Sequence, residues 1–146
     1  MEVSRNAPVV AASEIDIAAP PETVWDVLTD FERWPRWNPD VKSMSFSGTV
    51  GEGAVFRWRA GPGTISSRIR RVDRPRLIGW TGKTLGIEAV HVYRLEPHDG
   101  GTHVTTEESY EGALARLFRG PILRMLENAL ETGLDRLKAE SERRAA

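Results

Sequence analysis

The chain has 146 residues, of which 40% are apolar, and a formal net charge of −1 at pH 7. This length predicts one domain, residues 1–146, with enough apolar side chains for a core, and the near-zero charge gives no overall attraction to nucleic acid or an anionic membrane. The absence of cysteine excludes disulfides, thiolate metal sites and a cysteine nucleophile.

The first ten residues contain no apolar run typical of a signal peptide, and no stretch approaches the length of a membrane span. We therefore expect a cytoplasmic protein without membrane insertion. Residues 1–8 are mostly polar, and we expect them to be frayed.

Residues 9–18 alternate between apolar and polar side chains, which predicts a strand. The phase of the alternation slips in the middle, and this slip suggests a bulge near Ser13. The side chains expected to face inward are Val10, Ala12, Ile15 and Ile17.

Two short helices are predicted next, over residues 21–29 and 31–36. Pro21 suits the first turn of the first helix, because its missing N–H would have no partner there. Trp25, Trp34 and Trp37 lie in or beside these helices, and we expect them to be packing residues.

Alternation with a period of two then continues for about seventy residues and is interrupted only by turn signals. The predicted strands are residues 41–47, 53–60, 64–73, 76–82, 86–96 and 102–111. Consecutive strands joined by short turns are typical of an antiparallel meander.

The C-terminal region, residues 113–146, is helical in pattern. Its apolar side chains change phase across Gly120 and Pro121, which predicts a kink or two helices. After Pro121, one half of the helix carries Ile122, Leu123, Met125, Leu126, Ala129, Leu130, Gly133, Leu134 and Leu137.

Ala129 and Gly133 lie at the centre of this apolar face, although glycine inside a helix costs about 1 kcal/mol relative to alanine. Two interpretations stay open: a close approach of the helix to the sheet, or space for a ligand beneath the helix. The order of elements predicts an α+β domain in which a curved antiparallel seven-stranded sheet wraps around a long C-terminal helix, with two short helices after the first strand.

Four polar side chains share the inward phase of the last two strands: His91, Tyr93, Glu108 and Tyr110. His91 is either a general acid/base or a hydrogen-bonded core histidine. Glu108 either faces the apolar interior, which would raise its pKa, or lies close enough to solvent to stay hydrated. The two tyrosines either donate hydrogen bonds to a ligand or only pack.

Basic residues concentrate in the middle of the chain, and several of them alternate away from the apolar face: Arg57, Arg59, Arg68, Arg70, Arg71, Arg74 and Arg76. Aromatic side chains lie on the opposite face, so the mixed basic and aromatic platform of an RNA-binding sheet is missing. We expect a solvated outer face and no nucleic acid partner. His98 and His103 flank a turn, but this is a weak signal, and we expect neither a metal nor a cofactor.

The chain resembles the START-like (SRPBCC) superfamily, in particular its polyketide cyclase/dehydrase and lipid-transport-like branch, from about residue 12 to residue 138. The stretches that carry the resemblance are residues 15–17, 20–25, 34–39, 72–82, 91–97 and 107–112, together with Asp30, Gly101 and Thr102. The resemblance implies a helix-grip fold with a deep apolar cavity. It also implies a mouth bordered by the turns at residues 61–63 and 83–86 and by the segment around residues 117–123.

Three hypotheses follow. In the first, the protein is a monomer or homodimer that binds a hydrophobic, aromatic or polyketide-like or lipid-like small molecule, with His91 and Glu108 as polar anchors. In the second, it is a polyketide cyclase/aromatase or dehydratase, with His91 shuttling a proton and Tyr93 or Tyr110 polarising a carbonyl. In the third, the basic sheet face binds a protein partner. The predicted cavity wall is Phe56, Trp58, Ile69, Trp80, Tyr93, Tyr110, Met125, Leu126, Ala129 and Leu130.

Overall fold

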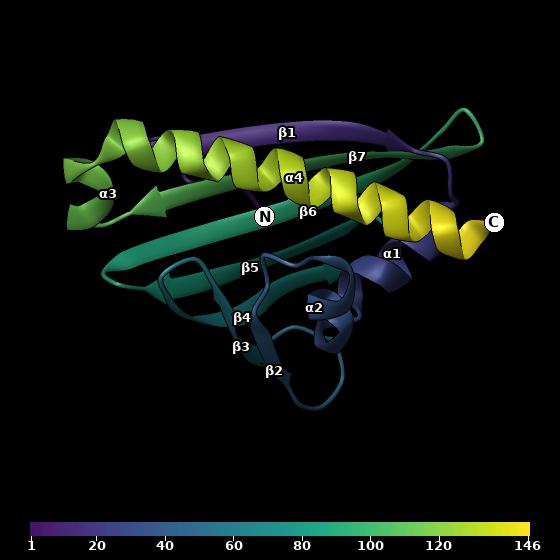
Figure 1. The fold of residues 1–146 in the computed structure, drawn as a ribbon, viewed down its shortest axis with the longest axis horizontal. Helices are drawn as coiled ribbons and strands as arrows, with labels where there is room; N and C mark the ends of the chain where they lie inside the picture. Colours follow the sequence, from purple (N-terminus) through teal and green to yellow (C-terminus); the bar gives the residue numbers. More distant parts are fainter.

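The computed structural model describes residues 1–146 and contains one seven-stranded antiparallel sheet, in the order β1-β7-β6-β5-β4-β3-β2. The elements are β1 (Val9–Ile17), α1 (Pro21–Thr29), the 3-10 helix η1 (Phe31–Arg33), α2 (Trp34–Trp37), β2 (Ser43–Phe46), β3 (Val55–Ala60), β4 (Gly63–Asp73), β5 (Leu77–Thr84), β6 (Ile87–His98), β7 (Gly101–Glu111), α3 (Ala113–Leu117) and α4 (Arg119–Ala145). The last six strands form the predicted meander, and β1 joins it beside β7 (Figure 1). The predicted α+β helix-grip fold is confirmed.

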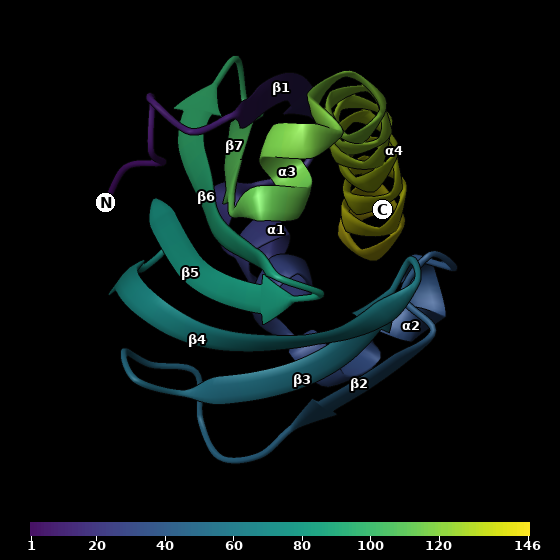
Figure 2. The ribbon, with the colours of Figure 1, turned by 90° about the vertical axis from the view of Figure 1, so that its left-hand side faces the viewer.

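The sheet curves strongly, and α4 lies along its open side (Figure 2). In α4, Leu126, Leu130, Leu134 and Leu137 are buried. Their spacing of four, four and three residues places them on one helical face, which therefore covers the inside of the sheet. None of the helices combines the length and the apolar composition that a membrane span needs.

The predicted bulge near Ser13 is absent, because β1 pairs with β7 in unbroken register from Val9 opposite Tyr110 to Ile17 opposite Thr102. Unbroken alternation places the whole strand in the phase of Ile17. Val9 and Ala11 are therefore buried, while Val10 is partly exposed and Ala12 is exposed, which corrects the predicted inward set. The irregularity in the sheet lies instead between Ile69 and Arg71 of β4.

The predicted interruption of the C-terminal region is present, but it lies at Phe118, two residues before Gly120. Phe118 has φ −119° and ψ 42°, so it leaves the helical conformation and separates α3 from α4. Pro121 falls in the first turn of α4, where its missing N–H is tolerated.

Residues 1–8 are not frayed, contrary to the sequence-based expectation. They run along the convex side of the sheet (Figure 2), where Val3 and Ala7 are buried. The Ser4 amide donates to Ser109 Oγ at 3.1 Å, and Arg94 donates to the Met1 carbonyl at 2.8 Å. The polar composition of this segment did not reveal its order, because the residues that hold it lie on strands distant in the sequence.

The apolar side chains form two separate clusters. The larger surrounds α1, η1 and α2 and contains Trp25, Phe31 and Trp34, while partly buried Trp37 packs against it, so the three predicted tryptophan packing residues are confirmed. The smaller lies under the first half of α4 and contains Leu126 and Leu130.

Candidate functional site

A cavity of about 740 Å³ lies between the inner face of the sheet and α4. Its size is within the range of small-molecule sites, about 300–1,000 Å³. Most of its wall is apolar, and α2, β3–β7, α3 and α4 all contribute side chains.

The cavity depends on the small residues of α4. Ala129 and Gly133 both line it, and a Cβ atom added to Gly133 would meet no atom within 4 Å. Gly133 therefore does not serve a close approach of helix and sheet. Of the two interpretations that the sequence left open, space beneath the helix is the one that the structure contains at this position.

The polar group of the cavity is centred on His91 of β6 and Glu108 of β7, which are direct cross-strand partners. Both side chains point to the concave side, with His91 Nδ1 3.4 Å from Glu108 Oε1. The other ring nitrogen, Nε2, lies 2.8 Å from Thr106 Oγ1. The ring of Tyr93, also in β6, lies 4.7 Å from the His91 ring. The ring of Trp80, in the neighbouring strand β5, lies 5.0 Å from the His91 ring.

Burial keeps this group uncharged near neutral pH. Desolvation lowers the pKa of His91 from 6.5 to about 3 and raises the pKa of Glu108 from 4.5 to about 8. In both residues the charged form is disfavoured because it loses hydration in an apolar surrounding. The remaining exposed part of the Glu108 side chain, 13%, faces the cavity, so a ligand that displaces water strengthens this effect. Burial also raises the pKa of Tyr93 and Tyr110.

The structure brings ten of the twelve predicted wall and anchor residues to the cavity. They are Trp58, Trp80, His91, Tyr93, Glu108, Tyr110, Met125, Leu126, Ala129 and Leu130. Their contact with a ligand stays a prediction.

Phe56 and Ile69 do not line the cavity and instead belong to the larger core cluster. Phe56 packs against Phe31, with ring centres 4.6 Å apart, because η1 covers this part of the sheet. Inward phase alone cannot separate wall residues from core residues, since both share it.

The sequence-based wall omitted Trp34, Trp37 and Leu114, which also line the cavity, as do Phe118 and Ile122 of the segment predicted to border its mouth. The phase change between α3 and α4 could have identified Leu114 and Phe118, because it shows that their side chains belong to a different apolar face from that of α4.

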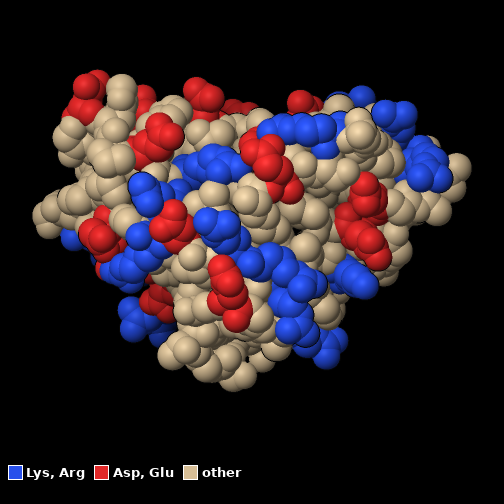
Figure 3. Space-filling view, turned by 180° about the vertical axis from the view of Figure 1, so that it is seen from behind, with Lys and Arg blue, Asp and Glu red and all other residues tan.

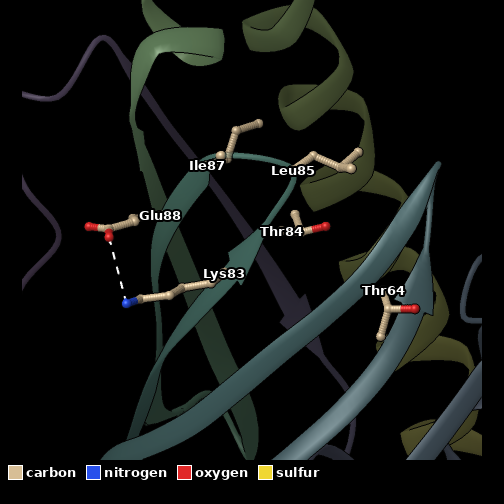
Figure 4. A pocket seen from close by; sticks show the side chains of 7 residues that line it. Thr64, Lys83, Thr84, Leu85, Ile87 and Glu88 are labelled. Atoms are coloured by element: carbon tan, nitrogen blue, oxygen red, sulfur yellow. Dashed lines mark ion pairs between the residues drawn. The ribbon is translucent and has the colours of Figure 1, made fainter.

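Charged side chains lie at the rim. Lys42 and Asp40 are exposed, and Asp40 forms a 2.8 Å ion pair with Arg136. The implied borders of the mouth agree with the lining, which includes Gly61–Gly63, Leu85 and Phe118. Beside the β5–β6 turn a shallow pocket of about 410 Å³ shares Thr84, Leu85 and Ile87 with the cavity (Figure 4). There the Lys83–Glu88 ion pair, at 3.7 Å, points away from both apolar side chains.

The convex face of the sheet carries five of the seven predicted basic residues. At the β4–β5 turn Arg74 instead pairs with Glu22 of α1 at 2.7 Å, and Arg76 pairs with Asp73 at 3.3 Å. Figure 3 shows Lys and Arg side chains gathered across this face, with acidic groups among them. Arg57, Arg59, Arg68, Arg70 and Arg71 are all exposed. Arg68 donates to the Gly53 carbonyl and Arg70 to Thr81 Oγ1, both neutral acceptors. The structure has no group of three or more His, Asp and Glu side chains arranged to hold a metal ion.

A family model described as polyketide cyclase / dehydrase and lipid transport matches residues 8–142. The Zhui aromatase/cyclase from Streptomyces sp. R1128 is 21% identical, with 94% of this chain and 95% of that chain covered and a TM-score of 0.76. A START superfamily protein from Mycobacterium smegmatis is 18% identical, with 92% and 97% covered and a TM-score of 0.78. A hypothetical protein from Helicobacter pylori is 16% identical, with 94% and 90% covered and a TM-score of 0.83. These likenesses show the fold, and no curated protein matches the chain.

Proposed function

The chain belongs to the polyketide cyclase / dehydrase and lipid transport family, and from this premise we propose that it binds a hydrophobic small molecule of aromatic, polyketide-like or lipid-like character. The observation that supports the proposal is the cavity of about 740 Å³, with its apolar wall and a few convergent polar groups. Burial of apolar ligand surface supplies the driving force, at about 25 cal/mol per Å².

Native mass spectrometry with a panel of flavonoids, fatty acids and aromatic polyketides tests this proposal. We expect a one-to-one adduct with at least one compound. Gly133→Leu should abolish the adduct, because the added side chain extends into the space beside Gly133. Gly133→Ala is the matched control, since its single methyl group has room and leaves most of the volume free.

The absence of any adduct with the wild-type protein would contradict the proposal. An adduct that persists unchanged in Gly133→Leu would place the ligand outside this cavity.

The His91–Glu108 pair favours a second candidate function, a dehydratase or cyclase acting on a ligand in the cavity. Neutral His91 can accept a proton from a carbon beside a carbonyl, while protonated Glu108 donates its proton to the departing hydroxyl group, which leaves as water. A proton then passes from His91 to Glu108 across the 3.4 Å contact, so both groups return to their starting states.

This enzymatic candidate ranks second because a pKa of about 3 makes His91 a weak base. The bound ligand can be followed by mass over time. A dehydratase removes one water from it in the wild type and fails to do so in Glu108→Gln, with the adduct itself retained. A carrier leaves the ligand mass unchanged in both proteins.

The exposed arginines support a third candidate, binding of an acidic protein partner on the convex face. Immobilised polyglutamate should retain the wild type at low salt, and Arg57→Ser combined with Arg59→Ser should weaken this retention. Polyglutamate that retains neither protein would remove this candidate.

A further inference from the structure

The charges along the cavity wall restrict the ligand that the cavity can hold. Lys42 is the only Lys or Arg that lines it, and Lys42 is exposed at the rim. The acidic lining residues are Asp40, which is also exposed, and Glu108. An ionised ligand group beside Glu108 would therefore lose its hydration without gaining a cation, which is strongly unfavourable.

The groups around Glu108 also restrict the polarity of the ligand. A carboxylic acid and two phenols each carry a hydroxyl donor, and neutral His91 carries one N–H. The His91–Glu108 separation of 3.4 Å exceeds the usual hydrogen-bond range of about 2.7–3.2 Å, so this pair does not use its full bonding capacity internally. An oxygen atom that accepts hydrogen bonds but has no hydrogen to donate, as in a carbonyl group, matches this set of donors.

We infer that the ligand is an uncharged molecule whose carbonyl oxygen lies against Glu108 and Tyr110, with its apolar body beneath α4. The inference rests on the proposed binding function and adds the class of ligand to it. An apolar body fits the opposite wall, where α4 presents Leu126, Ala129 and Leu130. A fatty acid would have to leave its carboxylate at the rim near Lys42, away from the polar group.

A dependence on pH follows, because ionised Glu108 no longer donates a hydrogen bond and places a negative charge beside the carbonyl. The titratable groups that face it are His91 and Tyr93 from β6 and Tyr110 from β7. His91 stays uncharged down to a pH well below 7. The pKa of each tyrosine lies above its ordinary value of about 10, so neither tyrosine ionises in the range of interest. From β1, Ala11 pairs opposite Glu108, and α4 presents only apolar side chains to the cavity, with Asp40 and Lys42 at the rim.

The first test compares two fluorescent probes that share an aromatic skeleton, neutral phenylnaphthylamine and its anionic sulfonate, anilinonaphthalene sulfonate. We expect the neutral probe to bind at least about tenfold more tightly. Flavone, an uncharged aromatic ketone, should displace it. Gly133→Leu should prevent binding of both neutral compounds, and Gly133→Ala should not.

The second test measures flavone affinity from about pH 6 to pH 9, with circular dichroism as the check that the protein stays folded. Because the pKa of Glu108 is about 8, about one tenth of the protein holds the carboxylic acid at pH 9, and the affinity should fall about tenfold. The isosteric variant Glu108→Gln cannot ionise and keeps an N–H donor, so its affinity should stay constant across this range.

The outcomes distinguish the ligand class from the binding function itself. Tighter binding of the sulfonate, or wild-type flavone affinity that does not change with pH, would overturn the neutral-carbonyl class while cavity binding stands. Failure of phenylnaphthylamine, flavone and the sulfonate to bind would overturn the neutral-carbonyl class, and it would overturn the proposed binding function as well if no compound of the mass-spectrometry panel gives an adduct.

Discussion

Replacing Glu108 by Gln should remove a specific loss of stability at high pH. The pKa of this carboxyl rises from 4.5 in the unfolded chain to about 8 in the folded protein, so the folded state holds one extra proton between these values. The contribution of Glu108 is fully present below pH 4.5 and is lost as the pH rises through about 8. The slope is about 1.4 kcal/mol per pH unit, or about 5 kcal/mol over the whole interval.

His91 acts in the opposite direction. Its pKa falls from 6.5 to about 3, so the folded state holds one proton fewer between these values and stability falls as the pH drops below 6.5. Between about pH 4.5 and 6.5 the two proton differences cancel. This pair should therefore give the wild type a plateau of stability in that window, with a decline on each side.

Urea unfolding followed by the fluorescence of the five tryptophans measures this at each pH. His103 is distant from Glu108 and contributes equally to both proteins. Tyr93 and Tyr110, whose pKa the Glu108 charge also raises, titrate above this pH range, so the difference between the two free energies of unfolding isolates Glu108. We expect this difference to change by about 2 kcal/mol between pH 6 and pH 8, in favour of Glu108→Gln, because the carboxyl is already half ionised at pH 8. A difference that stays constant within about 0.5 kcal/mol would show that the carboxyl is hydrated and ionised in the folded protein, and would refute the reasoning.

Three further substitutions test the packing by urea unfolding. Gly133→Ala should stabilise the protein by about 1 kcal/mol, because alanine is the better helix former and its methyl group has room; destabilisation would mean that the helix lies closer to the sheet. Gly112→Ala should destabilise it by about 2–4 kcal/mol, since Gly112 has φ +116° and a Cβ would collide with the Gly86 carbonyl. An unchanged free energy of unfolding would contradict this backbone conformation of Gly112. Trp34→Phe should remove about 1–2 kcal/mol by leaving the buried Leu28 carbonyl without its 2.9 Å hydrogen bond, and unchanged stability would argue against that bond.

The elements themselves could be predicted because their signals are local. Alternation in the meander and the apolar face of α4 each follow from the repeat of one element, and each is confirmed. The local signal failed for β1, where the correct phase depends on unbroken pairing with β7. It also failed for residues 1–8, whose partners are Ser109 and Arg94 on strands about ninety to one hundred residues away in the chain.

In β6 and β7 the alternation alone predicts which side chains face the inside of the sheet, including His91, Glu108 and Tyr110, because successive side chains of a strand point to opposite faces. Which inward residues border the cavity and which are covered depends on contacts between elements that are distant in the chain. Phe56 lies beneath η1 and is core, whereas Trp58, two residues along the same strand, borders the cavity. The register of β6 and β7 makes His91 and Glu108 neighbours, and the apolar enclosure formed with α4 keeps both uncharged, because a pKa depends on surroundings that distant segments supply.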